Sequence, residues 1–242
     1  MEYRYADQQD WEFLSSGNIL KHFSGMPAFP VRLNLELFGR AAEKIGKTDG
    51  FAVYDPCCGS GYSLAVLGLM RGGQIRAIVG SDVDPACVDA AASNLSLLRR
   101  DGILAARDRI LNAPETTPER RTQLEAAVER VLPLIGDREL PANVFRHDIL
   151  ASPPSLPEPV DYVFADIPYG NLTAWRTSEP TADPVERMLA NLCPILADKG
   201  VVAVCGTKEL RVRAEGYIRR GKLRAGHRLI VLLQKLGGKT GL

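Results

Sequence analysis

The feature that most constrains the fold of this chain is a series of short apolar runs that close on an acid. The runs FAVYD, AIVGSD, NVFRHD and YVFAD end at Asp55, Asp82, Asp148 and Asp166. Apolar runs of this length, bounded by turn residues, are typical of strands that are buried on both faces. Helical patterns follow the first two runs, so the sequence predicts a mostly parallel sheet with helices on both faces.

Two later runs extend this sheet. The run VVAVCG at residues 201–206 predicts a further buried strand. The run HRLIVLLQK at residues 227–235 follows the segment LRAG closely, as in a hairpin at the end of the chain. Because the two strands of a hairpin run in opposite directions, we expect a Rossmann-like α/β fold with one antiparallel strand.

Start signals predict where the helices begin. Pro30 suits the first position of a helix over VRLNLELFGRAAEKI, in which apolar residues recur at helical spacing. Asp84 and Pro85 form an N-cap and first-position pair for a helix after the second strand. The segment SLAVLGLM, which follows the first strand, is apolar all round and predicts a buried helix.

The connection over residues 99–141 is longer than an ordinary loop between a helix and a strand. Thr117 and Pro118 are a helix start signal within it, and its basic and acidic residues balance, as on a solvated face. We therefore expect one domain, residues 1–242, with an N-terminal helical extension at 1–46 and a helical insertion at 99–141.

The composition is that of an ordinary globular protein, with 242 residues, 45% hydrophobic, 24% charged and a formal net charge of +1. This balance excludes a strong overall field, so any contact with nucleic acid must be local. The first residues contain no apolar leader and no stretch is long and apolar enough to span a bilayer, so we expect a cytoplasmic monomer without membrane contact. The five cysteines form no C-x-x-C pair, which argues against a zinc or disulfide framework.

The acids at the strand ends predict a single site, because ligands of open parallel sheets bind beyond the carboxyl ends of the strands. In the loop D-P-C-C-G-S-G after the first strand, Gly59 and Gly61 allow the backbone to turn sharply and to approach a ligand closely. Asp82 can accept hydrogen bonds from a ribose diol. Asp148 is either an acceptor for an adenine amino group or an ordinary turn residue.

A second loop, D-I-P-Y-G at residues 166–170, follows the strand YVFAD. Asp166 offers a carboxylate there, Pro168 stiffens the turn, and Tyr169 offers a flat ring on which a planar group can stack. The sequence therefore predicts that this loop can bind a planar group.

These two loops carry a resemblance to a known family. D-P-C-C-G-S-G with D-I-P-Y-G is similar to the cofactor and catalytic loops of class I S-adenosylmethionine-dependent methyltransferases that act on nitrogen. The segments PAFPVRL, DPCCGSGY, VLGL, SDVDP and D-x-P-Y-G resemble more closely the avilamycin-resistance guanine methyltransferases of large-subunit ribosomal RNA. This resemblance covers the chain from about Pro27 onward.

The resemblance implies a seven-stranded sheet, S-adenosylmethionine as donor, S-adenosylhomocysteine as product, no metal, a ribosomal RNA guanine as acceptor, and a role in antibiotic resistance. Cys57 stands where many methyltransferases have the first glycine, and Ile167 replaces the first proline of the catalytic loop. Catalysis is expected from Asp166, Pro168 and Tyr169, and cofactor binding from Asp55, Pro56, Cys57, Gly59, Gly61, Asp82, Val83, Asp148 and Ile149.

The acid at position 166 favours guanine over adenine. The two oxygens of a carboxylate match the N1–H and 2-amino donors of guanine, whereas the donor and acceptor of adenine suit an amide better. We therefore expect Asp166 to orient the base and receive its proton, while N1 and N2 remain alternatives as the methylated atom. Cys57 and Cys58 lie in the cofactor loop, which argues against a nucleophilic cysteine and cytosine C5 chemistry.

The RNA contact is expected near the C-terminal end of the chain. From Lys208 to Arg228, eight Lys and Arg residues face two Glu, a net charge of +6. Arg32 and Trp175 are further candidates for the flipped base or its neighbours, although Trp175 is equally suited to packing. The expected RNA-binding residues are Arg32, Trp175, Lys208, Arg211, Arg213, Arg219 and Arg220. The alternatives are methylation of tRNA or another nucleic-acid base, and a non-catalytic RNA-binding protein with this fold.

Overall fold

The computed structural model describes the whole chain except residues 24–27, 169–174, 176, 178–180 and 238–242. Its centre is a seven-stranded sheet in the order β3-β2-β1-β4-β5-β7-β6. Strand β7 is antiparallel to β5 and β6, and the other neighbouring pairs are parallel, which confirms the predicted sheet and its one antiparallel strand. The strands are β1 (Phe51–Asp55), β2 (Ile75–Asp82), β3 (Ala142–Arg146), β4 (Val160–Asp166), β5 (Leu196–Thr207), β6 (Tyr217–Ala225) and β7 (Arg228–Lys235).

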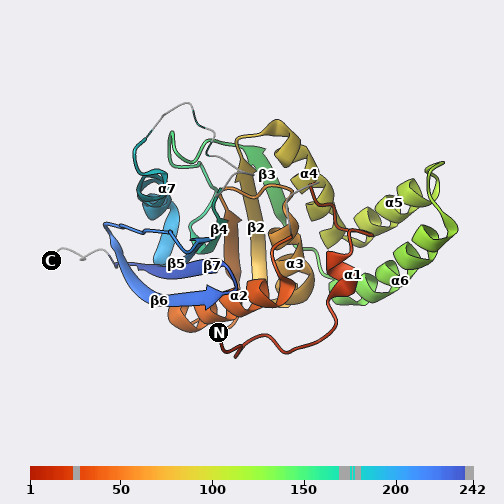
Figure 1. Ribbon diagram of the computed structural model, residues 1–242, viewed down its shortest axis with the longest axis horizontal. Helices are drawn as coiled ribbons and strands as arrows, with labels where there is room; N and C mark the ends of the chain where they lie inside the picture. Colours follow the sequence, from red (N-terminus) through yellow and green to blue (C-terminus); the bar gives the residue numbers. More distant parts are fainter. Residues whose placement is uncertain (24–27, 169–174, 176, 178–180, 238–242) are drawn as a thin grey trace.

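Helices cover both faces of this sheet (Figure 1). Helices α2, α3 and α4 contact the strands from one face, and α7 packs on the other. The helices are α1 (Glu12–Ser15), α2 (Val31–Ile45), α3 (Tyr62–Arg71), α4 (Pro85–Leu95), α5 (Arg100–Leu111), α6 (Pro118–Ile135) and α7 (Pro184–Leu192), with 3-10 turns η1 (Gly72–Gln74), η2 (Ser96–Leu98) and η3 (Cys193–Ile195).

Two hydrophobic cores result from the alternation of side chains along each strand. On β4, Tyr162 and Phe164 pack in the core beneath α2 and α3, whereas Val163 and Ala165 pack in the core beneath α7. Because successive side chains of a strand point to opposite faces, a central parallel strand must be apolar at every position. The YVFA run meets this requirement, so packing on both faces fixes the position of β4 and of its carboxyl end.

The predicted start signals are confirmed at two helices. The Asp84 side chain accepts a hydrogen bond from the Ala86 amide at 2.9 Å, and Thr117 Oγ1 accepts one from the Arg120 amide at 3.2 Å. Helix α2 begins at Val31, one residue later than predicted, because Pro30 has an extended ψ of 125° and occupies the N-cap. The last two positions expected in the strand NVFRHD are wrong, since β3 ends at Arg146.

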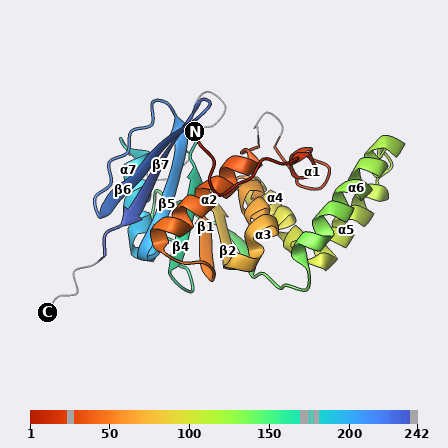
Figure 2. The ribbon, with the colours of Figure 1, turned by 90° about the horizontal axis from the view of Figure 1, so that it is seen from below.

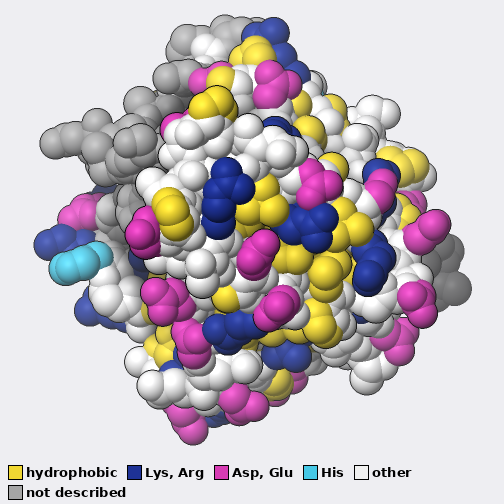
Figure 3. Space-filling view, turned by 90° about the vertical axis from the view of Figure 1, so that its right-hand side faces the viewer, with side chains coloured by type: hydrophobic (Ala, Val, Ile, Leu, Met, Phe, Trp, Pro, Cys, Tyr) yellow, Lys and Arg dark blue, Asp and Glu magenta, His cyan; other side chains and the backbone are white. Residues whose placement is uncertain are grey.

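Helices α5 and α6 occupy most of the long connection between α4 and β3. They pack against each other and project beyond the edge of the sheet (Figure 2). Leu124, Val128 and Val131 of α6 are buried, as their helical spacing predicts. Figure 3 shows this end of the molecule, where positive and negative side chains are interspersed. The described helices include none that is long and apolar enough to cross a bilayer.

The N-terminal segment is attached to α2 and α6 by buried and exposed polar contacts. Glu36 is fully buried in α2, and its Oε2 accepts hydrogen bonds from the amides of Arg4 and Tyr5 at 2.8 and 2.7 Å. Asp10 pairs with Arg130 of α6 at 2.7 Å. These contacts fix the residues before α1 against α2 and α6.

Candidate active site

A cavity of about 550 Å³ lies at the carboxyl ends of β1, β2 and β4, where the acids of the predicted strands meet. The acids come together because parallel strands end at the same edge of the sheet. The predicted residues that line the cavity are Asp55, Pro56, Cys57, Gly59, Asp82, Val83, Asp148, Ile149, Asp166, Pro168 and Trp175. Tyr169 lies outside the described residues.

The loop after β1 is held by the carboxylates on either side of it. Asp55 Oδ1 accepts a hydrogen bond from the Cys57 amide at 3.0 Å, and Asp82 Oδ2 accepts one from the Gly59 amide at 2.9 Å. Gly59 has a φ of +53°, which only glycine adopts readily, and a Cβ placed there would meet no atom within 4 Å. The loop therefore presents its bare backbone to the cavity.

Gly61, in the same loop, allows close packing between two helices. Its φ is +69°, and a Cβ at this position would lie 2.9 Å from the Cβ of Ala91 in α4. Gly61 is the N-cap of α3 and is not part of the cavity wall. It allows α3 and α4 to approach each other, which places the start of α3 beneath the loop.

The carboxylates of Asp82 and Asp148 accept hydrogen bonds within local turns. Asp82 Oδ1 also accepts the Asp84 amide at 3.0 Å, so each of its oxygens receives one backbone donor. Asp148 Oδ1 accepts the Leu150 amide at 2.9 Å, and its Oδ2 accepts the Thr177 hydroxyl at 2.8 Å. Asp148 thus lies in a turn beyond β3 and also lines the cavity, and its contact with an adenine amino group stays a prediction.

Asp166 differs from these acids because one of its oxygens is unsatisfied. Its Oδ1 is buried and has no hydrogen-bond partner among the described residues. Burial raises the pKa of Asp166 to about 6, while the positive charge of Arg228 acts in the opposite direction. At neutral pH this carboxylate is therefore mostly ionised and close to the range in which a general base works best.

Burial also raises the pKa of Asp55 well above its usual value, and the neighbouring carboxylates of Asp166 and Asp82 add to the effect. Burial, followed by the charge of Asp55, raises the pKa values of the Cys57 and Cys58 thiols. These shifts favour the neutral thiol over the reactive thiolate at both positions.

The structure adds wall residues that sequence analysis missed, among them His22, Phe23, Phe29 and Arg228. Phe29 packs edge-on against Phe164 of β4 with ring centroids 4.9 Å apart, and the Arg228 guanidinium lies 5.1 Å from the centre of the Phe29 ring. Phe29 belongs to the segment PAFPVRL, whose resemblance to the family could have marked it. For Arg228 the only available signal was its position in the basic C-terminal segment.

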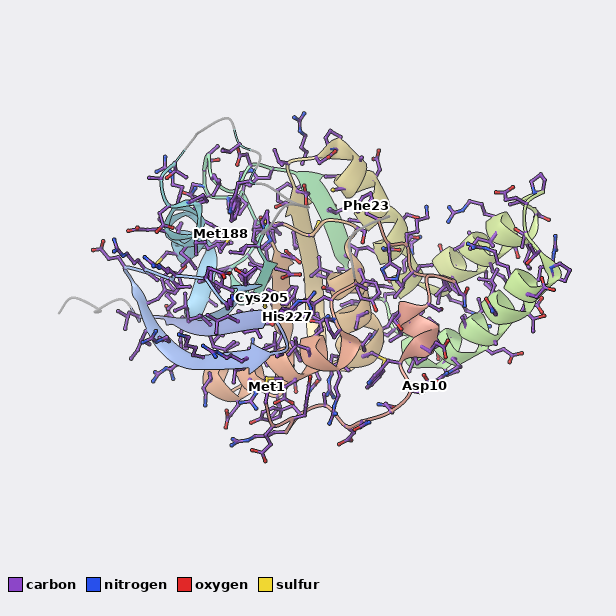
Figure 4. The ribbon with its side chains drawn as sticks, viewed as in Figure 1. Met1, Asp10, Phe23, Met188, Cys205 and His227 are labelled. Carbon is purple, nitrogen blue, oxygen red and sulfur yellow. The ribbon has the colours of Figure 1, made fainter. Side chains whose placement is uncertain are left out.

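Asn94 of α4 fastens the segment that carries His22 and Phe23. Its Oδ1 accepts the Lys21 amide at 2.8 Å, and its Nδ2 donates to the Lys21 and Ser60 carbonyls at 3.0 and 2.8 Å. Asn94 is fully buried, and it joins the N-terminal segment to the glycine loop. Phe23, labelled in Figure 4, lies in this connection between α1 and α2.

Among the predicted RNA-binding residues, only Trp175 reaches the main cavity. Arg32 bonds the Ala6 carbonyl at 3.0 Å and stacks 4.0 Å from the Tyr3 ring centre, so it holds the N-terminal segment rather than lining the cavity. Arg211, Arg213 and Arg219 are exposed, as is Arg220, whose Nε donates to Gln234 at 2.7 Å.

A second cavity, of about 300 Å³, adjoins the first at Arg228. It is formed by the end of β5 and the turn between β6 and β7, and its basic lining residues are Lys208, Arg224, His227 and Arg228. His227, labelled in Figure 4, lies in this turn. Within the described residues, no cluster of three or more His, Cys, Asp or Glu side chains could hold a metal ion.

The geometry can be compared with known proteins. The family model described as rRNA methyltransferase AviRa matches residues 1–228. A Streptomyces viridochromogenes protein named 23S rRNA (guanine(2535)-N(1))-methyltransferase is 38% identical over an alignment of 216 residues, and the match covers 84% of each of the two chains.

Solved structures are consistent with these sequence matches. The 1.5 Å structure of rRNA methyltransferase aviRa from S. viridochromogenes has a TM-score of 0.82 at 30% identity, and the match covers 97% of this chain and 96% of that one. A putative class I S-adenosylmethionine-dependent methyltransferase from Listeria monocytogenes shares the fold, with a TM-score of 0.55, 16% identity, and coverage of 94% of this chain and 67% of that one. The sheet order, the cavity and these matches together show that the chain belongs to the AviRa family of ribosomal RNA methyltransferases.

Proposed function

We propose that this protein transfers a methyl group from S-adenosylmethionine to N1 of a guanine in large-subunit ribosomal RNA. The observation that carries the proposal is the buried Oδ1 of Asp166 at the end of β4, which has no partner among the residues that the structure describes, because a group of this kind needs a donor from a ligand. The name of the S. viridochromogenes relative, which specifies 23S rRNA and guanine N1, supports the substrate and the atom.

The cavity suits a donor that carries a sulfonium, a ribose and an adenine. Four acidic side chains, those of Asp55, Asp82, Asp148 and Asp166, line it, whereas Arg228 is the only Lys or Arg among the described lining residues. The lone pairs that remain on Asp82 can accept a ribose diol, and the backbone from Cys57 to Gly59 can hold the methionine part. Val83, Asp148 and Ile149 would border the adenine, and Pro56 and Gly61 would shape the loop.

S-adenosylmethionine supplies, when bound, an electrophilic methyl group, and it keeps the electron pair of the broken C–S bond as S-adenosylhomocysteine. The protein therefore has to position a guanine and remove a proton from it. Positioning of this kind can contribute roughly 7 to 11 kcal/mol to the lowering of a barrier. No metal ion has a role in this proposal.

Asp166 orients the guanine and receives its N1 proton. Its two oxygens match the N1–H and 2-amino donors, and burial makes each of these hydrogen bonds stronger than it would be in water. Pro168 restricts the loop that follows, and the Ile167 amide donates to the Cys205 carbonyl at 3.0 Å, which fixes the loop to β5. Stacking of Tyr169 and contact of Trp175 with the base or its neighbours belong to the same proposal.

The RNA backbone is expected to run over the second cavity and the exposed arginines beyond it. Lys208 lines that cavity, and Arg211, Arg213, Arg219 and Arg220 lie on the segment around β6. Lys and Arg side chains neutralise phosphates and position the strand without reading its sequence. Methylation of the rRNA would then weaken the binding of an antibiotic, as the family resemblance implies.

The proposal is tested by tritiated methyl transfer to purified 23S rRNA, assembled large subunits and tRNA, followed by nucleoside mass spectrometry. We expect 1-methylguanosine in 23S rRNA or in the large subunit. Label in tRNA alone, or a product other than 1-methylguanosine, would contradict it. Asp166→Asn should abolish transfer while calorimetry still detects binding of S-adenosylmethionine, and a protein that binds RNA but no S-adenosylmethionine would be a non-catalytic module.

A further inference from the structure

Two buried polar atoms of opposite kind lack partners in the same part of the molecule. Asp166 Oδ1 is an acceptor, Arg228 Nε is a donor, and neither has a hydrogen-bond partner within the described part of the chain. Both residues line the main cavity. Because an unsatisfied buried polar group is costly, such a pair of groups is best explained by a ligand that offers a donor and an acceptor side by side.

The register of the sheet places these two residues close together. Asp166 is opposite Cys205 on β5, and Arg228, the first residue of β7, is opposite Thr207 on the same strand. The Arg228 charge is near enough to influence the Asp166 carboxylate, yet Asp166 Oδ1 and Arg228 Nε have no hydrogen-bond partner among the described residues. The two residues therefore line one cavity from β4 and β7, the strands on either side of β5.

The aromatic ring of Phe29 holds the guanidinium in this place. Arg228 lies 5.1 Å from the ring centre of Phe29, which packs edge-on against Phe164 at 4.9 Å. A cation over an aromatic face is attracted by the ring, and the planar guanidinium keeps its remaining donors directed outward. Arg228 is thus preorganised before any RNA arrives.

We propose that Arg228 is a catalytic residue that donates a hydrogen bond to O6 of the target guanine while Asp166 accepts the N1 proton. This inference rests on the proposed function. O6 and N1–H are adjacent on guanine, as an acceptor beside a donor, and they complement Arg228 and Asp166 in that order. Adenine presents an amino group in place of O6, which would face the arginine donor, so the same pair selects against adenine.

The pair also accounts for the charge that develops during the reaction. The N1 proton passes to the Asp166 carboxylate, and the electron pair that it leaves on N1 is shared with O6. That pair then forms the new N1–CH3 bond. A guanidinium at O6 stabilises the negative charge of the deprotonated base, as the donors of an oxyanion hole do. Asp166 afterwards releases its proton to solvent through the open side of the cavity.

The test compares Arg228→Gln and Arg228→Lys with the wild type on the RNA that the wild type methylates. Arg99→Gln is the matched control, because Arg99 is exposed at the start of α5 and pairs with Asp101. Removing one oxyanion-type donor lowers kcat by about 10²- to 10³-fold, so we expect this loss in Arg228→Gln, a smaller loss in Arg228→Lys, and none in the control. Calorimetric affinity for S-adenosylmethionine should remain unchanged in all four proteins.

The pH profile separates a catalytic role from a structural one. Loss of the Arg228 charge should raise the pKa of Asp166 further, so the acidic limb of the kcat/KM profile should move to higher pH in Arg228→Gln. A loss confined to the KM for RNA, with the limb unmoved, would instead make Arg228 a phosphate ligand of the second cavity and would overturn the proposal. So would a kcat within about threefold of the wild type.

A spectroscopic measurement gives a readout that does not depend on turnover. The fluorescence of 8-azaguanine rises when its N1 is deprotonated, so an RNA that carries this base at the target position reports the N1 pKa in the complex with S-adenosylhomocysteine. We expect the wild type and Arg99→Gln to lower this pKa, and Arg228→Gln to restore it toward the value in free RNA. Equal values in all complexes would refute the role of Arg228. Absence of guanine methylation by the wild type would instead refute the proposed function.

Discussion

Two glycines of the cofactor loop allow a sharp test of how the site is built. Gly59 and Gly61 both have φ values in the left-handed region, +53° and +69°. A Cβ at Gly61 would lie 2.9 Å from the Cβ of Ala91, whereas a Cβ at Gly59 would meet nothing within 4 Å. Alanine therefore imposes a similar backbone penalty at both positions, but only Gly61→Ala forces α3 and α4 apart.

The magnitudes follow from these two contributions. A left-handed non-glycine residue costs roughly 1 to 2 kcal/mol, and inserting a methyl group into a close-packed contact costs roughly 1 to 3 kcal/mol more. We expect the free energy of unfolding to fall by about 1 to 2 kcal/mol in Gly59→Ala and by about 2 to 5 kcal/mol in Gly61→Ala. At roughly 2 to 4 °C per kcal/mol for a chain of this length, Tm drops on the order of 10 °C in the latter.

The two substitutions should affect cofactor binding in the reverse order, with Gly59→Ala weakening it more than Gly61→Ala. Gly59 lines the cavity, so we expect a methyl group there to reduce the space for the cofactor, and an overpacking penalty of roughly 1 to 3 kcal/mol corresponds to an affinity loss of about 5- to 150-fold. Gly61 does not line the cavity. Below the unfolding transition, we therefore expect Gly61→Ala to bind S-adenosylmethionine with nearly wild-type affinity.

Urea unfolding and titration calorimetry measure the two effects separately. Gly46→Ala is the matched control, because Gly46 has a φ of +78°, no atom within 4 Å of a Cβ, and a position at the end of α2 away from the cavity. It should lose stability like Gly59→Ala and keep its affinity. If Gly59→Ala and Gly61→Ala unfolded within about 0.5 kcal/mol of each other, the argument from the Ala91 contact would be refuted.

Further predictions concern the acids and the basic surface. The kcat/KM profile should have an acidic limb at about pH 6, set by Asp166, and Asp166→Asn should abolish this limb together with methyl transfer. Because burial raises the pKa of Asp166 from 3.8 to about 6, the folded state binds the proton more tightly than the unfolded state, and stability declines as pH rises between these values. Asp166→Asn should remove this decline and increase the free energy of unfolding at pH 8 by up to about 3 kcal/mol. An unchanged urea unfolding curve would contradict the argument from burial. Asp82→Asn keeps an acceptor for the loop but loses the charge, and calorimetry should show at least tenfold weaker binding of S-adenosylmethionine, consistent with about 1.5 to 3 kcal/mol for a charged hydrogen bond. Arg213→Gln and Arg219→Gln should each weaken RNA binding without changing kcat and reduce the salt dependence of the affinity by about one unit, whereas an unchanged salt slope would remove these residues from the RNA path.

The central strands and the acids at their ends were predictable because they obey a local rule. The runs that end at Asp55, Asp82 and Asp166 are apolar at nearly every position, as burial on both faces requires, and the structure ends β1, β2 and β4 at those residues. The run before Asp148 is less apolar because β3 is an edge strand whose residues are partly or fully exposed. Its end was accordingly predicted two residues too late.

The walls of the cavity were not predictable in the same way, because they depend on contacts between distant segments. Phe29 is placed by an edge-on contact with Phe164, and Arg228 by the register of β7 against β5. Strand β6 begins at Tyr217, well before the predicted LRAG segment, since an edge strand needs apolar residues on one face only. Composition and periodicity carry no information about such pairings.

The hydrogen bonds of Asn94 have a consequence for the order in which the protein matures during synthesis. The Lys21 backbone leaves the ribosome first, but its partner follows 73 residues later, and the Asp10 partner Arg130 follows 120 residues after Asp10. Both partners precede β4 and β5 in the chain, so the N-terminal segment can attach before the central strands are complete. Arg228 of β7 is translated last among the described residues that line the cavity, so the cavity wall is completed only near the end of translation.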